Sequence, residues 1–178
     1  MYWASQTEAM SCNNPELQRV IFSLGSNVGD RLATLESACD YLADVFGGLH
    51  LSQLYETEPV GCPAGSPSYL NACVEVSTAM PPQEVLELCM RIEKELGRER
   101  NGTYGAPRTC DIDLIMHGDT QLQSPTLTLP HPRAHLREFV LRPLCDIDPH
   151  LTLPGHSLSV SAMLAALPAG PAVQAFEL

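Results

Sequence analysis

A pair of aspartates inside an apolar run is the feature of this sequence best suited to chemistry. Asp111 and Asp113 stand two residues apart in "CDIDLIMHG". In a β-strand, residues at this spacing point to the same face, roughly 7 Å apart. Two carboxylates so placed repel each other, so a cation should lie opposite them. Mg²⁺ is a strong candidate, because it binds a few carboxylates together with substrate phosphates. Two readings without metal stay open, namely pairing with arginine or an exposed pair on an edge strand.

Basic residues are concentrated near these aspartates, although the protein as a whole is acidic, with a formal net charge of −11. Arg98, Arg100 and Arg108 bracket the turn-rich stretch "RERNGTYGAPR", which leads directly into the aspartate strand. Arginines beside metal-binding carboxylates are what polyphosphate transfer requires, because they neutralise charge on the transferring group. A solvent-exposed helix face would produce some of the same clustering. The sequence has no GxxxxGK[ST] motif, which excludes a P-loop.

Composition narrows the class of protein. The 178 residues, 44% hydrophobic and 17% charged, suit one globular domain. The negative charge argues against nucleic acid or an anionic membrane as partner, and no apolar run is long enough to cross a bilayer. The seven cysteines form no CxxC pair, so we expect neither a zinc site nor a disulfide framework. A reducing cytoplasm fits this pattern.

The elements that must position the aspartates follow the order β-α-β-β-α-β. This order predicts an α+β fold of the ferredoxin-like kind, an antiparallel sheet with two helices on one face, followed by a C-terminal extension. We expect a loose leader over 1–18, one domain over 19–167 and a frayed tail over 168–178. The expected elements are strands at 19–27, 49–61, 68–78 and 109–118, and helices at 30–46, 81–97 and 134–142, with a last helical turn at 160–167. Gly25 to Asn27 is interpreted as the turn that ends the first strand.

Seven segments, in order, resemble one known family. They are "SLGSNVGDR", "YETEPVG", "SPSYLNACVEV", "RIEKELGRER", "GAPRTCDIDLI", "LPHPR" and "REFVLRPLCDIDP". The family is 6-hydroxymethyl-7,8-dihydropterin pyrophosphokinase of folate biosynthesis, and the resemblance runs from about Arg19 to Pro154. It implies a cytosolic, ferredoxin-like enzyme that moves the terminal pyrophosphate of ATP to the pterin hydroxymethyl group and releases AMP.

The resemblance also implies roles for individual residues. Asp111 and Asp113 would hold two Mg²⁺, and with Arg98 and Arg108 they would form the catalytic set. The residues implied to bind ATP are Glu93, Arg98, Arg100, Arg108, Ile112, His131 and Arg137. The residues implied to bind the pterin are Thr57, Glu58, Val60, Tyr69, Asn71 and Phe139. A flat ring with a polar edge suits aromatic walls and one amide that both donates and accepts, although isolated residues of these types more commonly lie in a core or turn.

Departures from the family pattern leave rivals open. Tyr104 and Gly105 stand where the family usually has a basic residue and then an aromatic or polar one, and Pro132 stands where some members have tyrosine. In the family these positions lie in loops that touch the nucleotide, so we expect the departures to change ATP affinity and rate and to leave the reaction type unchanged. The rivals are a related Mg²⁺-dependent transferase with another acceptor and a non-catalytic binding module. We expect ATP and the dihydropterin as substrates, and a monomer. We assign the other histidines, including His117, to the surface or to loops, and Cys110 to the core.

Overall fold

The computed structural model describes residues 16–59, 65–98 and 109–177. Its centre is a six-stranded antiparallel sheet with the order β5-β1-β4-β3-β8, in which β2 also pairs with β4. The strands are β1 (Gln18–Ser26), β2 (His50–Leu51), β3 (Tyr55–Thr57), β4 (Tyr69–Thr78), β5 (Asp111–His117) and β8 (Val173–Ala175). A separate hairpin pairs β6 (Leu122–Gln123) with β7 (Thr128–Leu129). The expected mixture of helices with an antiparallel sheet is confirmed.

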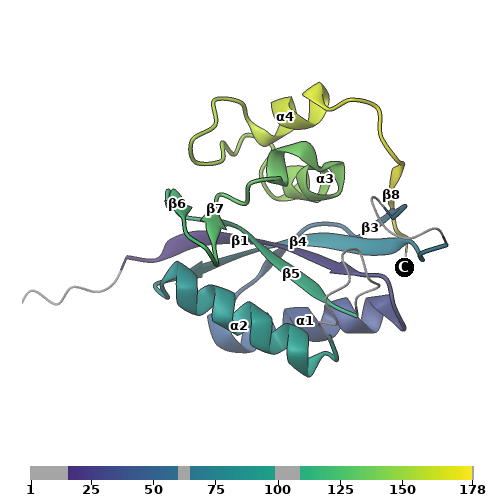
Figure 1. The fold of residues 1–178 in the computed structure, drawn as a ribbon, viewed down its shortest axis with the longest axis horizontal. Coiled ribbons are helices and arrows are strands. Elements are labelled where there is room, and N and C mark those ends of the chain that lie inside the picture. Colours follow the sequence, from purple (N-terminus) through teal and green to yellow (C-terminus); the bar gives the residue numbers. More distant parts are fainter. Residues whose placement is uncertain (1–15, 60–64, 99–108, 178) are drawn as a thin grey trace, which may run out of the picture.

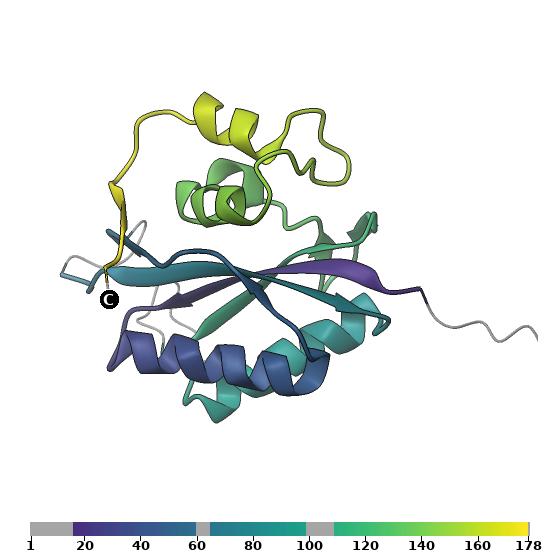
Figure 2. The ribbon, with the colours of Figure 1, turned by 180° about the vertical axis from the view of Figure 1, so that it is seen from behind.

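Helices cover both faces of the sheet (Figures 1 and 2). One layer contains α1 (Arg31–Phe46) and α2 (Pro82–Glu95). The opposite layer contains α3 (Glu138–Ile147) and α4 (Val160–Ala166), which follow the short 3-10 turn η1 (Ala134–Leu136). Asp30 is the N-cap of α1, because its carboxylate accepts the Ala33 N–H at 3.1 Å.

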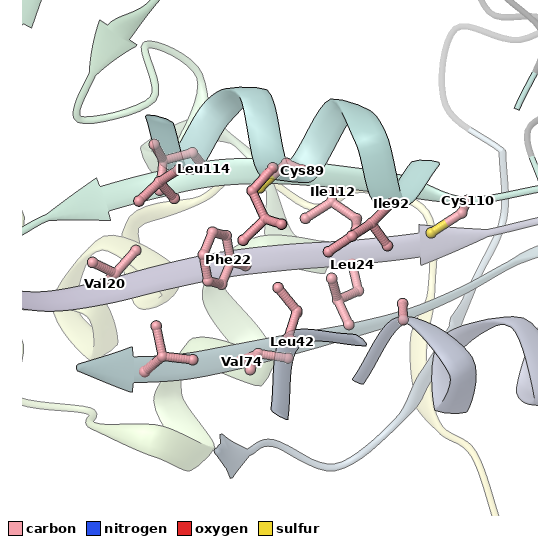
Figure 3. Close-up of a cluster of buried hydrophobic side chains, with 14 of the residues drawn as sticks. Val20, Phe22, Leu24, Leu42, Val74, Cys89, Ile92, Cys110, Ile112 and Leu114 are labelled. Atoms are coloured by element: carbon pink, nitrogen blue, oxygen red, sulfur yellow. The ribbon is translucent and has the colours of Figure 1, made fainter. Parts of the chain in front are cut away.

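Each helical layer has its own hydrophobic core. Between the sheet and the layer of α1 and α2, Phe22 and Leu24 of β1 lie beside Ile112 and Leu114 of β5 (Figure 3). The second core lies between the sheet and α3 and α4, and includes Ile21, Cys73, Leu141, Leu144 and Val160. Full burial of one large side chain contributes about 1.5 to 3 kcal/mol, so both layers fix the sheet firmly. Cys110 belongs to the first core, as expected.

Several expectations need correction. The expected strand at 49–61 is two short strands, β2 and β3, and the expected helix at 134–142 is η1 followed by α3. The tail was expected to be frayed, but β8 pairs with β3, with Thr57 opposite Val173. His117 is not on the surface, since it is 4% exposed and its Nε2 lies 2.8 Å from the Met80 carbonyl oxygen. In the described residues, we find no helix with the length and apolar character needed to span a bilayer.

Candidate active site

The aspartate pair lies on β5, an edge strand of the described sheet. The alternation along the strand is as expected, with Ile112 and Leu114 buried on the side of α2. Asp111 and Asp113 point to the opposite face, and their side chains are 19% and 36% exposed. The edge position matters because both carboxylates stay accessible while the strand itself is anchored in the core.

Arg98 pairs with the first carboxylate, and Glu93 holds both Arg98 and the strand in place. Arg98 Nη1 lies 2.5 Å from Asp111 Oδ1 and also donates to Glu93 Oε1. The same Glu93 oxygen accepts the Ile112 backbone N–H at 2.9 Å. Because β5 is an edge strand, this N–H is not used in the ladder with β1, and Glu93 on α2 supplies its acceptor. The buried carboxylate thus connects α2, the arginine and the strand that carries the aspartates.

The second carboxylate faces a basic pair from the opposite layer. Arg137 Nη1 lies 3.4 Å from Asp113 Oδ2, and His131 Nε2 lies 3.9 Å from the same oxygen. The His131 N–H donates to the Ile115 carbonyl oxygen at 2.8 Å, which holds this residue against β5. Burial lowers the pKa of His131 below its usual value of 6.5, although Asp113 opposes the shift. At neutral pH the imidazole is therefore mainly neutral, and the positive charge beside Asp113 comes from Arg137.

A cavity of about 350 Å³ opens beside β5. It is bounded by α2 on one side and by the segment 124–132 on the other. Pockets for small ligands start at about 300 Å³, so its size is sufficient for such a molecule. The site residues that line it are Glu93, Arg98, Asp111, Ile112, Asp113 and His131. The expected nucleotide group is therefore brought together in space, as far as the described residues include it.

The donor set beside this cavity suits a hard cation. Asp111 and Asp113 offer only oxygen ligands, and both carboxylates border the cavity. Mg²⁺ binds such sites through one or two carboxylates and takes its remaining ligands from water and substrate phosphates. The residues present thus fit Mg²⁺ delivered with a nucleotide.

A second group lies on the same face of the sheet, two strands away. Asn71 Nδ2 donates to Thr57 Oγ1 at 2.8 Å, and the two residues are 4% and 5% exposed. Tyr69 stands opposite Thr57 in the ladder between β3 and β4. Helix α3 covers this face, because Cys73 Sγ, two residues beyond Asn71, lies 3.5 Å from the Val140 carbonyl oxygen. This contact places the neighbouring Phe139 on the same side as the amide.

Some expected residues cannot be placed in this arrangement. Glu58 is exposed beyond the end of β3. Val60, Arg100 and Arg108 lie outside the described residues, as do Tyr104 and Gly105.

Two further positions near the site were not predicted from the sequence. Gly25 was interpreted as part of a turn but lies within β1, paired on both sides. A glycine in a strand interior commonly marks a close approach, but this signal becomes readable only once the neighbouring strands are known. Arg31 Nη1 lies 2.7 Å from Glu56 Oε1 and 2.9 Å from the Ser68 carbonyl oxygen. No local pattern identifies that link, because its three members lie far apart or in different segments of the chain: Arg31 on α1, Glu56 on β3 and Ser68 before β4.

Comparison with known proteins decides the family. Residues 21–149 match the model described as 7,8-dihydro-6-hydroxymethylpterin-pyrophosphokinase (HPPK). The chain belongs to this family. It is 43% identical over 136 residues to the 2-amino-4-hydroxy-6-hydroxymethyldihydropteridine pyrophosphokinase of Porphyromonas gingivalis, covering 74% of this chain and 92% of that protein. The enzyme of the same name from Bacillus subtilis is 41% identical over 127 residues, covering 70% and 75%.

HPPK sequences also occur within longer proteins. A folate synthesis bifunctional protein of Arabidopsis thaliana is 38% identical over 140 residues, covering 77% of this chain but 28% of that protein. A solved HPPK-DHPS structure of Plasmodium falciparum superposes with a TM-score of 0.69 at 13% identity, covering 86% of this chain and 46% of that one. This structural likeness supports the fold alone.

Proposed function

We propose that this HPPK-family protein transfers the terminal diphosphate of MgATP to 6-hydroxymethyl-7,8-dihydropterin in folate biosynthesis, giving the pterin diphosphate and AMP. One observation carries the proposal. The acidic pair borders the cavity at the sheet edge and shares a face of the sheet with the buried Asn71 amide, with only β1 between them. The names of the similar proteins from Porphyromonas and Bacillus agree with this reaction.

The cavity beside β5 is the proposed nucleotide site. Asp111 and Asp113 would hold Mg²⁺, and we propose two ions, which would supply charge neutralisation for the triphosphate. Arg98 is held between Glu93 and Asp111 at the wall of the cavity, where its guanidinium can turn to a phosphate oxygen. Arg137, whose Nη1 lies 3.4 Å from Asp113 Oδ2, adds a second cation. These groups position and neutralise the phosphates, which is the main contribution a protein makes to phosphoryl transfer.

The group around Asn71 is the proposed pterin site. The Asn71 Nδ2 donates to Thr57, and the Asn71 Oδ1 can accept from a ring N–H of the pterin. Tyr69 and Phe139 supply aromatic surface for the ring faces. The Arg137 guanidinium carbon lies 5.4 Å from the centre of the Phe139 ring, so one contact links the proposed pterin wall with the cation beside Asp113.

Bond changes follow from this placement. The pterin hydroxymethyl oxygen attacks the β-phosphorus of ATP, the bond from that phosphorus to the α,β-bridging oxygen breaks, and AMP leaves. The hydroxyl proton is released as the new P–O bond forms. Catalysis here needs no covalent intermediate on the protein.

We propose the ferredoxin-like arrangement, which the strand order β5-β1-β4-β3 and the placement of α1 and α2 on one face support. Roles for Val60, Arg100 and Arg108 remain predictions from the family pattern, as do the domain limits 19–167, a monomeric state and a cytoplasmic location.

A coupled assay for AMP tests the function. AMP formation from MgATP should require 6-hydroxymethyl-7,8-dihydropterin, and should stop when EDTA removes the divalent cation. AMP formation at equal rates with and without the pterin would contradict the proposal. Turnover with a different alcohol acceptor only would favour the rival transferase.

A further inference from the structure

Gly25 occupies the position between the two proposed half-sites. In the ladder of β1 with β4 it stands opposite Asn71, and in the ladder of β1 with β5 it stands opposite Asp111. Directly paired residues of an antiparallel sheet project their side chains to the same face. Asn71 of the proposed pterin site, Gly25 and Asp111 therefore form one row across three strands, with the glycine in the middle.

A side chain at this position would fill the gap between the half-sites. A Cβ atom built on Gly25 would lie 3.2 Å from Asn71 Oδ1, 3.9 Å from Tyr69 Cδ1 and 4.0 Å from Asp111 Cβ. Its three nearest neighbours are thus two proposed pterin residues and a proposed metal ligand. The space above Gly25 is the shortest route along the sheet from one half-site to the other.

The backbone does not explain why glycine stands here. Gly25 does not have a positive φ, so its backbone conformation suits any L-residue. Glycine in a strand interior is also less stable than alanine by roughly 0.5 to 1 kcal/mol. The requirement is therefore one of space on the sheet surface.

We propose that the acceptor reaches the phosphate across the bare backbone surface at Gly25, which we call the floor. We further propose that the lack of a side chain there determines which acceptors react. This inference rests on the proposed function. Neighbouring strands lie about 4.8 Å apart, so the row from Asn71 to Asp111 spans roughly 10 Å. A dihydropterin whose ring edge is held by Asn71 directs its hydroxymethyl group across β1 toward the carboxylate. Because Gly25 has no side chain, the alcohol oxygen can approach the phosphorus closely, and a branched carbinol is excluded.

The test adds one methyl group to the floor. Gly25→Ala should lower kcat about a hundredfold, because displacement of a reacting atom by about 1 Å costs that much. Calorimetry with a non-hydrolysable MgATP analogue should give an affinity within about twofold of wild type. Gly48→Ala is the matched control, since Gly48 has no positive φ and no atom within 4 Å of its added Cβ. This control should keep wild-type turnover, and thermal melting should show both variants folded.

The variants separate the possible failures. If Asn71→Ala and Asp111→Asn also keep full turnover, the proposed site itself is misplaced. If these two lose turnover but Gly25→Ala keeps it, only the inference about the floor is overturned. A loss of nucleotide affinity as large as the loss of kcat in Gly25→Ala would also overturn it.

A second arm does not depend on how a variant folds. The wild-type protein is given 6-(1-hydroxyethyl)-7,8-dihydropterin, which carries the extra methyl group on the acceptor. We expect at least about a hundredfold lower kcat than with the hydroxymethyl compound, because the methyl again displaces the reacting oxygen. Equal turnover of both acceptors would contradict the inference.

Discussion

Replacing Glu93 with alanine should destabilise the protein and loosen its nucleotide site together. Glu93 is 3% exposed, and its Oε1 accepts both the Ile112 N–H and an Arg98 N–H. Loss of the acceptor leaves a buried amide unsatisfied, at a cost of about 1 to 3 kcal/mol. Loss of the charge-assisted contact with Arg98 costs about 1.5 to 3 kcal/mol more.

The two costs do not add fully. Arg98 keeps its bond to Asp111, and removing a buried carboxylate also removes the cost of desolvating it. We therefore expect the free energy of unfolding to fall by about 2 to 4 kcal/mol in Glu93→Ala. Glu93→Gln should lose about half as much, since an amide oxygen can still accept from Ile112.

Urea unfolding at pH 7, monitored by circular dichroism, measures these differences in the free energy of unfolding. Glu87→Ala is the control, because Glu87 is exposed on the same helix, and it should change stability by less than about 0.5 kcal/mol. A Glu93→Ala midpoint indistinguishable from that of Glu87→Ala would refute the reasoning, since it would mean that the carboxylate does not hold β5 and Arg98.

Three further outcomes are expected. Asn71→Ala should weaken pterin binding by about 1 to 3 kcal/mol, because ring polar groups lose their partner, and leave MgATP binding unchanged in calorimetry; equal losses for both ligands would assign Asn71 a structural role. Asp111→Asn should reduce turnover to below about a tenth at saturating Mg²⁺ while pterin affinity persists, because the carboxylate serves the phosphate side; a rate near wild type would rule out the proposed metal site. Arg31→Ala should raise KM for the pterin only a few-fold, worth about 0.5 to 1 kcal/mol, because the ion pair that it removes, with the 44% exposed Glu56, is weak. An equal rise in KM for ATP would contradict this expectation, because the effect of Arg31 would then not be confined to the strands beside the pterin site.

Local patterns in the sequence were sufficient to predict much of the fold. Alternation in "CDIDLI" placed Asp111 and Asp113 together on one face, since a strand has a period of two whatever surrounds it. The N-cap Asp30 follows from an equally local rule. Pairing of the aspartates with arginine, one of the alternatives that the sequence left open, is present through Arg98 and Arg137.

What could not be predicted depends on contacts between distant segments. The tail was expected to be frayed, but β8 pairs with β3 more than a hundred residues earlier in the chain. His117 is buried because its ring reaches the Met80 carbonyl oxygen before α2. Gly25 appeared to be a turn residue because a strand glycine and a turn glycine are indistinguishable until both neighbouring strands are known.

The product of the reaction tests the central claim most directly. Phosphorus-31 NMR of a mixture of the protein, MgATP and 6-hydroxymethyl-7,8-dihydropterin should show AMP and a pterin diphosphate, with two coupled phosphorus signals, in equal amounts. Equal formation of ADP and a singly phosphorylated pterin would mean attack at the γ-phosphorus. That result would contradict the placement of the acceptor across Gly25 from the phosphates held at Asp111 and Asp113.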